Sequence, residues 1–212
     1  LASAWLKEYG NETFFLFLHY WDTHQRYSPP APFNERFMGD ESLTVKELPS
    51  GEKFVRGAGK LAELDAANKE RVNLYDGEIC YVDDRLGKIL SILRELGIYD
   101  ETLIVVTGDH GDDMAEHNCN FEHRELYDSV IHVPLIYKLP KDLQIRKHKA
   151  VVDALVQHAD IKPTILDIVG AKNTPQFDGK SLKPLITGEG EDVREETFST
   201  GCWIYYDGRW KS

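Results

Sequence analysis

Carboxylate and imidazole side chains gather where an apolar run of the sequence ends. The β-branched run Leu103–Val106 predicts a buried strand, and Gly108-Asp109-His110-Gly111 follows one residue later. An aspartate oxygen and an imidazole nitrogen suit Ca²⁺, Mg²⁺, Mn²⁺ or Zn²⁺, depending on the other ligands. An isolated Asp-His pair is more often a capped turn. The preceding strand and the flanking glycines instead favour a metal or catalytic role for Asp109 and His110, because ligands bind beyond strand ends in α/β sheets. Further local carboxylates that could complete a metal site are Asp22, Asp112 and Asp113.

Three further histidines have the chemistry to act on an anionic ester. His24 follows the apolar run Thr13–His19, and His117 and His123 follow the Asp-His pair. A histidine beside a metal-bound ester can donate to an oxygen or protonate the leaving group, because its pKa lies near neutrality. Each could also be an ordinary loop residue, and His117 could simply hold its loop. We expect all three to contact substrate and His24 and His123 to be catalytic.

Helix and strand patterns alternate around these residues. Apolar residues recur every three or four positions over Glu70–Leu96, which predicts a long helix ending at Gly97. Thr13–His19 and Val133–Leu139 read as further strands, and Asp160 as the N-cap of a helix over Ile161–Val169. A helix followed by a buried strand is half of a βαβ unit, so the order predicts an α/β fold.

The remaining segments predict loops and a late strand region. Residues 25–68 read as a long loop with one short helix at Leu61–Asn68, and Phe177–Gly188 as a second loop. Phe198–Tyr206 predicts an edge strand or a hairpin around Asp207-Gly208. We expect one partial domain over residues 1–212, with an α/β core portion over 1–196 and the start of a C-terminal strand region over 197–212.

Composition narrows the class of protein. The chain has 212 residues, 42% hydrophobic and 29% charged, as in ordinary globular domains. Its net charge of −11 argues against nucleic acid and anionic membrane surfaces as partners. An anionic substrate would need a metal or local cations to reverse the negative electrostatic field in its binding cleft. No apolar run approaches the ~20 residues of a membrane span. The start at Leu1 suggests a piece of something longer, and nothing indicates the compartment.

Four stretches resemble the sulfatase branch of the alkaline-phosphatase superfamily. They are FFLFLHYWDTHQRYSPP, YDGEICYVDDRLGKILSILRELGIYDETLIVVTGDHGDD, EHNCNFEHRELYDSVIHVPLIY, and HADIKPTILDIVG with FDGKSLKPLITG. They follow the family's order near its spacings, within residues 13–30, 71–139 and 151–188. The resemblance implies a mostly parallel sheet sandwiched between helices, incomplete in this chain, with a metal at the carboxyl edge of the sheet.

The resemblance also implies roles for particular residues. Asp109 and His110 match a pair that binds a divalent metal, usually Ca²⁺, together with two acids from earlier in the chain. His24 matches the histidine of a PHxPY-like segment near the sulfate. His123 falls where members carry a lysine or histidine that contacts the ester. A metal and cations in such positions stabilise charge on the transferring group. The implied substrate is a small-molecule or glycan sulfate ester.

Two features of the family do not occur in this sequence. The family's nucleophile is a formylglycine made from the Cys or Ser of a C/S-x-P-x-R motif, and Cys80, Cys119 and Cys202 lack that context. The N-terminal acid pair does not occur either. The chain therefore resembles the central to C-terminal part of a sulfatase catalytic domain, and we expect it to be inactive alone.

Two other interpretations stay open. A phosphonate or phosphate ester hydrolase, or a phosphotransferase, of the same superfamily would share the Asp-His pair and differ in its nucleophile. A non-catalytic remnant domain would be kept for association, and it would self-associate through the sheet edge and apolar face that the missing N-terminal part leaves exposed.

Overall fold

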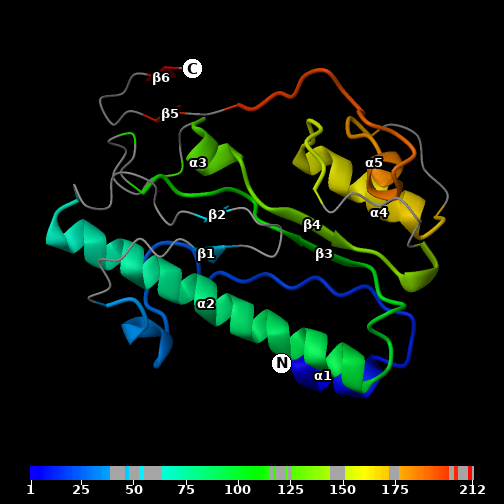
Figure 1. Cartoon of the computed structure of the whole chain (residues 1–212), viewed down its shortest axis with the longest axis horizontal. Helices are drawn as coiled ribbons and strands as arrows, with labels where there is room; N and C mark the ends of the chain where they lie inside the picture. The colour runs from blue at the N-terminus through cyan, green and yellow to red at the C-terminus, as the bar shows by residue number, and fades with distance from the viewer. Residues whose placement is uncertain are drawn as a thin grey trace. The chain divides into compact units, whose positions relative to one another are not determined.

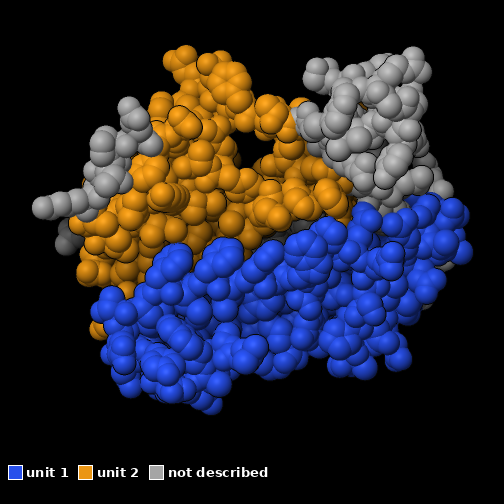
Figure 2. Space-filling model, turned by 180° about the vertical axis from the view of Figure 1, so that it is seen from behind, with its two compact units in different colours: residues 1–99 blue, residues 100–212 orange. Residues whose placement is uncertain are grey.

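The chain divides into two compact units, residues 1–99 and residues 100–212 (Figure 2). The computed structural model describes residues 1–38, 46–47, 53–54, 64–114, 117, 123, 126–143, 151–171, 177–200, 203–204 and 210–211. Figure 1 traces the helices and strands of both units. Within these residues, no helix combines the length and the apolarity needed to cross a bilayer.

The first unit is mainly helical. Its elements are α1 (Ala2–Tyr9), the 3₁₀ turn η1 (Phe33–Glu35), β1 (Lys46–Glu47), β2 (Lys53–Phe54) and α2 (Ala66–Glu95). The strands β1 and β2 pair antiparallel within the segment predicted as a long loop. The short helix predicted at Leu61–Asn68 lies partly outside the described residues, and Ala66 already belongs to α2.

The long helix α2 confirms the predicted helical pattern. It begins at Ala66, earlier than predicted, because the carboxylate of Asp65 accepts the backbone N–H of Asn68 at 2.8 Å and caps the first turn. Gly97, with φ of 72°, follows its C-terminal end, as the sequence predicts. Its buried residues are Val72, Gly77, Glu78, Ile89, Ile92 and Leu93.

The apolar run Thr13–His19, predicted as a strand, forms no strand in the structure. Its side chains alternate between exposed and half-buried positions, which is the alternation of a strand. Phe15 and Phe17 are 78% and 77% exposed. No strand of the described part of the chain pairs with this run, so it has the side-chain pattern of a strand without its hydrogen bonds.

The second unit holds the predicted Asp-His segment. Its elements are β3 (Ile104–Thr107), α3 (Asp128–Ile131), β4 (Leu135–Lys138), η3 (Lys141–Leu143), η4 (His158–Asp160), α4 (Ile161–Ile168), α5 (Lys183–Thr187), β5 (Trp203–Ile204) and β6 (Trp210–Lys211). The predictions of β3, β4 and α4 are confirmed within a few residues. The helix α5 lies inside a segment predicted as a loop, and β5 with β6 forms a hairpin where an edge strand or hairpin was expected.

The strand pairing differs from the expected mostly parallel sheet. The described strands form three two-stranded sheets, and each is antiparallel. Val105 pairs with Tyr137 and Val106 with Ile136 in the β3–β4 ladder. Parallel strands are usually joined by a crossover helix, and the one helix described between β3 and β4 is α3, with four residues. With one partner, β3 is half-buried and not fully buried as predicted. The complete sandwich and the division at residue 196 stay predictions.

A buried ion pair joins α4 to the segment after α5. The carboxylate of Asp160 is fully buried and accepts two hydrogen bonds from the Arg194 guanidinium, at 2.5 and 2.7 Å. It also accepts the backbone N–H groups of Gln157 and Lys180, each at 2.8 Å. These donors explain why Asp160 precedes α4 without capping it: its side chain makes no cap hydrogen bond within that helix.

We predict that Arg194→Ala lowers the free energy of unfolding by about 3 kcal/mol, because it leaves a buried carboxylate without its counter-charge. Chemical denaturation measures the change. The matched control is Glu196→Ala, an exposed position on the same segment, where we expect a change within about 0.5 kcal/mol. Equal effects at both positions would show that the ion pair contributes nothing specific.

Candidate metal and ester site

A close crossing of two backbone segments shapes the end of β3. The Gly111 N–H donates to the Val130 carbonyl at 2.7 Å. A Cβ on Gly111 would lie 2.0 Å from the carbonyl oxygen of Ser129, so only glycine fits there. Gly108 is different, since a Cβ there would meet atoms at ordinary distances of 3.5 Å and beyond. Of the two glycines expected at this turn, Gly111 is required by packing and Gly108 is not.

Asp109 and His110 lie close together at this turn. An Asp109 carboxylate oxygen accepts the His110 backbone N–H at 3.1 Å, and its other oxygen lies 3.8 Å from His110 Nε2. The Asp109 side chain is 79% exposed. His110 Nδ1 lies 3.0 Å from the Gly111 carbonyl, which can only accept, so Nδ1 carries the proton and Nε2 the lone pair. A ring that donates from Nδ1 can bind a metal ion through Nε2.

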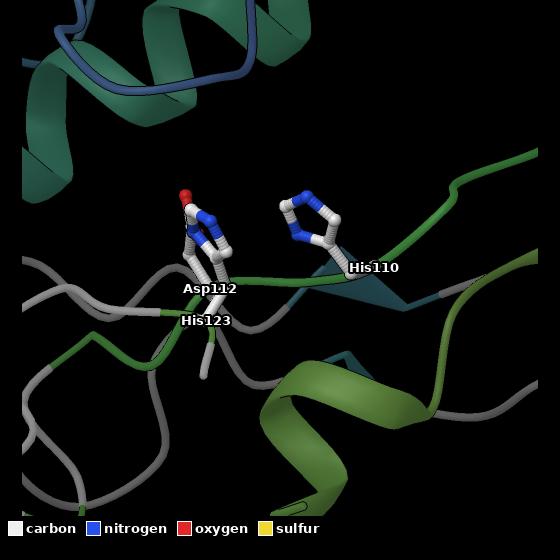
Figure 3. A group of neighbouring side chains, drawn as sticks. All are labelled: His110, Asp112 and His123. Carbon is white, nitrogen blue, oxygen red and sulfur yellow. The ribbon is translucent and has the colours of Figure 1, made fainter. Parts of the chain in front are cut away.

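His110 also belongs to a group with Asp112 and His123, shown in Figure 3. One ligand atom from each of these residues lies within 4.8 Å of the others. His123 Nδ1 lies 2.9 Å from an Asp112 oxygen, and the His110 and His123 rings stack with centroids 4.3 Å apart. The Asp112 side chain is only 5% exposed. From the sequence alone, Asp112 is one of three local carboxylates, and its partner His123 could not be predicted because 11 residues separate the two.

His117 lies in a second cluster built on Asp113. The Asp113 carboxylate is fully buried and lies 2.5 Å from His117 Nδ1, and it accepts the Ser129 hydroxyl at 3.3 Å. The His117 ring stacks on Tyr127 with centroids 3.7 Å apart. These contacts match the alternative in which His117 holds its loop. Its predicted contact with substrate stays a prediction.

His24 lies in the first unit, in the loop that follows the apolar run. Its backbone N–H donates to the Trp21 carbonyl at 3.0 Å, and its ring stacks on the Trp21 ring with centroids 4.3 Å apart. His24 Nδ1 lies 2.6 Å from the Gln25 carbonyl. The expectation that His24 is catalytic and contacts substrate stays a prediction.

Another histidine, which the sequence analysis did not select, holds the turn after β3. His158 Nε2 lies 2.8 Å from the Gly108 carbonyl. The turn is therefore tied to η4, next to the Asp160 ion pair. A lone histidine before a helix gives no sequence signal for such a contact across 50 residues.

The comparisons with known proteins give the family. The sequence matches the family model described as Sulfatase over residues 1–171, and the chain belongs to the sulfatase family. It is 28% identical to the multifunctional alkaline phosphatase superfamily protein PehA of Trinickia caryophylli, over 92% of this chain and 42% of that protein. It is 33% identical to an N-acetylglucosamine-6-O-sulfatase of Bacteroides thetaiotaomicron, over 55% of this chain and 20% of that protein.

A solved structure with the same fold is the phosphonate monoester hydrolase of Silicibacter pomeroyi. The two chains are 34% identical with a TM-score of 0.53, over 68% of this chain and 27% of that one. The predicted membership of the sulfatase family is thus confirmed, and the fold resembles that of this hydrolase over 68% of the chain. The chain spans less than half the length of these relatives.

We predict that Gly111→Ala destabilises the second unit by about 1–3 kcal/mol, since its methyl group would overlap the Ser129 carbonyl. Gly108→Ala is the matched control in the same turn, and we expect it to change the free energy of unfolding by less than about 1 kcal/mol. Urea denaturation of both variants tests the difference. A well-tolerated Gly111→Ala would show that the crossing is looser than the structure indicates.

Proposed function

We propose that this chain carries part of the active site of a metal-dependent sulfuric ester hydrolase. The observation that carries the proposal is the group at the end of β3 in a sulfatase-family chain: an Asp-His pair next to a second histidine that a buried carboxylate orients. The substrate is a small-molecule or glycan sulfate ester, and the similarity to an N-acetylglucosamine-6-O-sulfatase supports the glycan class.

Asp109 and His110 are the proposed metal ligands. Their donor atoms fit a divalent cation, because the Asp109 oxygens are exposed and His110 Nε2 carries a lone pair. A bound cation would stabilise negative charge on the ester oxygens. Ca²⁺ is the first choice from the family resemblance, and Mg²⁺, Mn²⁺ and Zn²⁺ remain alternatives.

His123 is the proposed proton donor and ester contact. Asp112 holds His123 Nδ1, so Nε2 is the nitrogen through which this ring would reach an ester oxygen. An Nε2–H on this ring is the group that would donate to a leaving group. His24 and His117 are proposed as further substrate contacts, each with Nδ1 held by a local partner.

We predict that Asp109→Ala and His110→Ala each abolish binding of Mn²⁺ to the chain. Mn²⁺ is the probe because its paramagnetism broadens NMR signals of nearby groups even when binding is weak. In the unmodified chain we expect broadening of the resonances of residues 108–112, and chelation should restore them. Asp142→Ala, at an exposed acid of η3, is the control and should keep the broadening.

The same titration also distinguishes a metal-binding catalytic domain from a non-catalytic remnant domain. Broadening that survives both ligand variants, or that is absent from the unmodified chain, would overturn the metal assignment. Absence of binding would favour a non-catalytic remnant domain, for which the exposed Phe15 and Phe17 are the present support, since exposed apolar surface promotes association.

The second candidate is a phosphonate or phosphate ester hydrolase of the same superfamily. Its support is the similarity to the Silicibacter pomeroyi phosphonate monoester hydrolase and to PehA. Both candidates need a nucleophile that this sequence does not contain, so we expect the chain alone to hydrolyse neither kind of ester.

We predict that the protein expressed from its complete gene hydrolyses p-nitrophenyl sulfate with a higher kcat/KM than p-nitrophenyl phenylphosphonate or p-nitrophenyl phosphate. His123→Ala should lower kcat about 10²–10⁴-fold, because it removes the proton donor. His132→Ala, at an exposed histidine of the same unit, should keep full activity. A preference for the phosphonate ester would move the assignment to the second candidate.

A further inference from the structure

A buried carboxylate on α2 holds the loop that carries His24. Glu78 is 4% exposed, and its Oε1 accepts the backbone N–H of Ser28 at 2.7 Å. The two residues are 50 positions apart, so this hydrogen bond joins the loop to the middle of the helix. Neither the proposed metal site nor the proposed acid-base chemistry uses Glu78.

Neighbouring contacts seat the loop on the same turn of α2. The buried Tyr27 ring meets the Tyr75 ring edge-on, with centroids 5.1 Å apart. At Gly77 the helix approaches the loop closely, since a Cβ there would lie 2.7 Å from the Phe33 carbonyl oxygen. The loop therefore docks through adjacent positions of one helical turn, and Glu78 supplies the hydrogen bond among them.

A carboxylate is energetically unfavourable at this buried position. Burial raises the pKa of Glu78, the Ser28 N–H opposes that rise, and the Asp22 charge adds to it. An apolar side chain would fill the same space without the cost of removing a charge from water. What an apolar side chain cannot do is accept the Ser28 N–H, which fixes the direction of the loop backbone.

The position of His24 depends on this backbone. Its contacts to Trp21 and Gln25 lie within the loop and set the ring relative to the loop backbone. The hydrogen bond at Ser28, four residues further along, ties that backbone to α2 by a directional interaction.

We propose that Glu78 is a positioning residue for His24, acting through the Ser28 amide to fix the loop on α2. The role deepens the proposed function, since it rests on His24 contacting the ester. It can be tested separately from turnover, because the Ser28 amide and the His24 ring give NMR signals that report the position of the loop.

The experiment measures two NMR signals in the 212-residue chain. These are the hydrogen-exchange rate of the Ser28 amide and the chemical shift of the His24 ring protons, which the stacked Trp21 ring displaces. The variants are Glu78→Ala, Glu78→Gln, which keeps an acceptor oxygen, and Glu78→Met, which fills the volume without charge or acceptor. Glu95→Ala, at an exposed acid near the end of the same helix, is the control.

We expect Glu78→Ala and Glu78→Met to speed Ser28 exchange at least tenfold and to move the His24 signals toward their values in urea. Glu78→Gln should restore both signals and Glu95→Ala should change neither. The Met variant should fold even if the Ala variant does not. Unchanged Ser28 exchange and His24 shifts in a folded Glu78→Met chain would overturn the proposal.

The ester role of His24 is judged in a different measurement. His24→Ala in the protein expressed from its complete gene should reduce turnover of p-nitrophenyl sulfate. Retained turnover would remove His24 from the proposed active site, whereas the Ser28 and His24 signals would still decide whether Glu78 holds the loop. In that complete protein, Glu78→Met should lower kcat and Glu78→Gln should restore it.

Discussion

The close approach of Gly111 to the Ser129–Val130 backbone is the constraint on which the candidate site depends. It lets the chain leave β3 and cross the segment that leads into β4, with one hydrogen bond of 2.7 Å at the crossing point. Asp109 and His110 lie before the crossing, and Asp112 and Asp113 follow it. A bulkier residue would separate the two segments. It would also move the buried Asp113 carboxylate away from the Ser129 hydroxyl that donates to it.

The buried carboxylates show how an acidic chain limits the cost of its charge. The net charge is −11, yet Asp112, Asp113 and Asp160 each meet a specific donor, from His123, His117 and Arg194. A buried charge with such partners is tolerated, whereas a buried charge without them is not. Two of these donors are histidines of the candidate site. The carboxylates that would repel an anionic ester thus each face an imidazole ring nitrogen of the candidate site.

Local sequence patterns were sufficient for the body of α2, for α4 and for the turn after β3, which follow from periodicity and from glycine placement. They missed the Asp65 cap that begins α2 and the short helix α5. The antiparallel pairing of the described strands could not be derived in the same way, because strand pairing depends on what lies beside a strand and not on its own residues. The run Thr13–His19 has a strand's alternation and no pairing partner in the described part of the chain. The contacts Asp112–His123 and Glu78–Ser28 could not be predicted from the sequence either, because they join residues 11 and 50 positions apart through the tertiary fold.

The hydrogen bonds of the predicted histidines share one feature that bears on their chemistry. His24 and His110 place Nδ1 against a backbone carbonyl, and His117 and His123 place Nδ1 against a carboxylate. In each case the partner of Nδ1 fixes the orientation of the ring, so Nε2 is the nitrogen through which a metal ion or an ester oxygen would meet it. Metal-ligating histidines are held by carboxylates as well as by backbone carbonyls, so the partner of Nδ1 determines which nitrogen is presented and not which ligand it meets. The proposed assignment of His110 to the cation and of His123 to the ester therefore rests on the position of His110 beside Asp109 and on the family resemblance, and not on the hydrogen bonds at Nδ1.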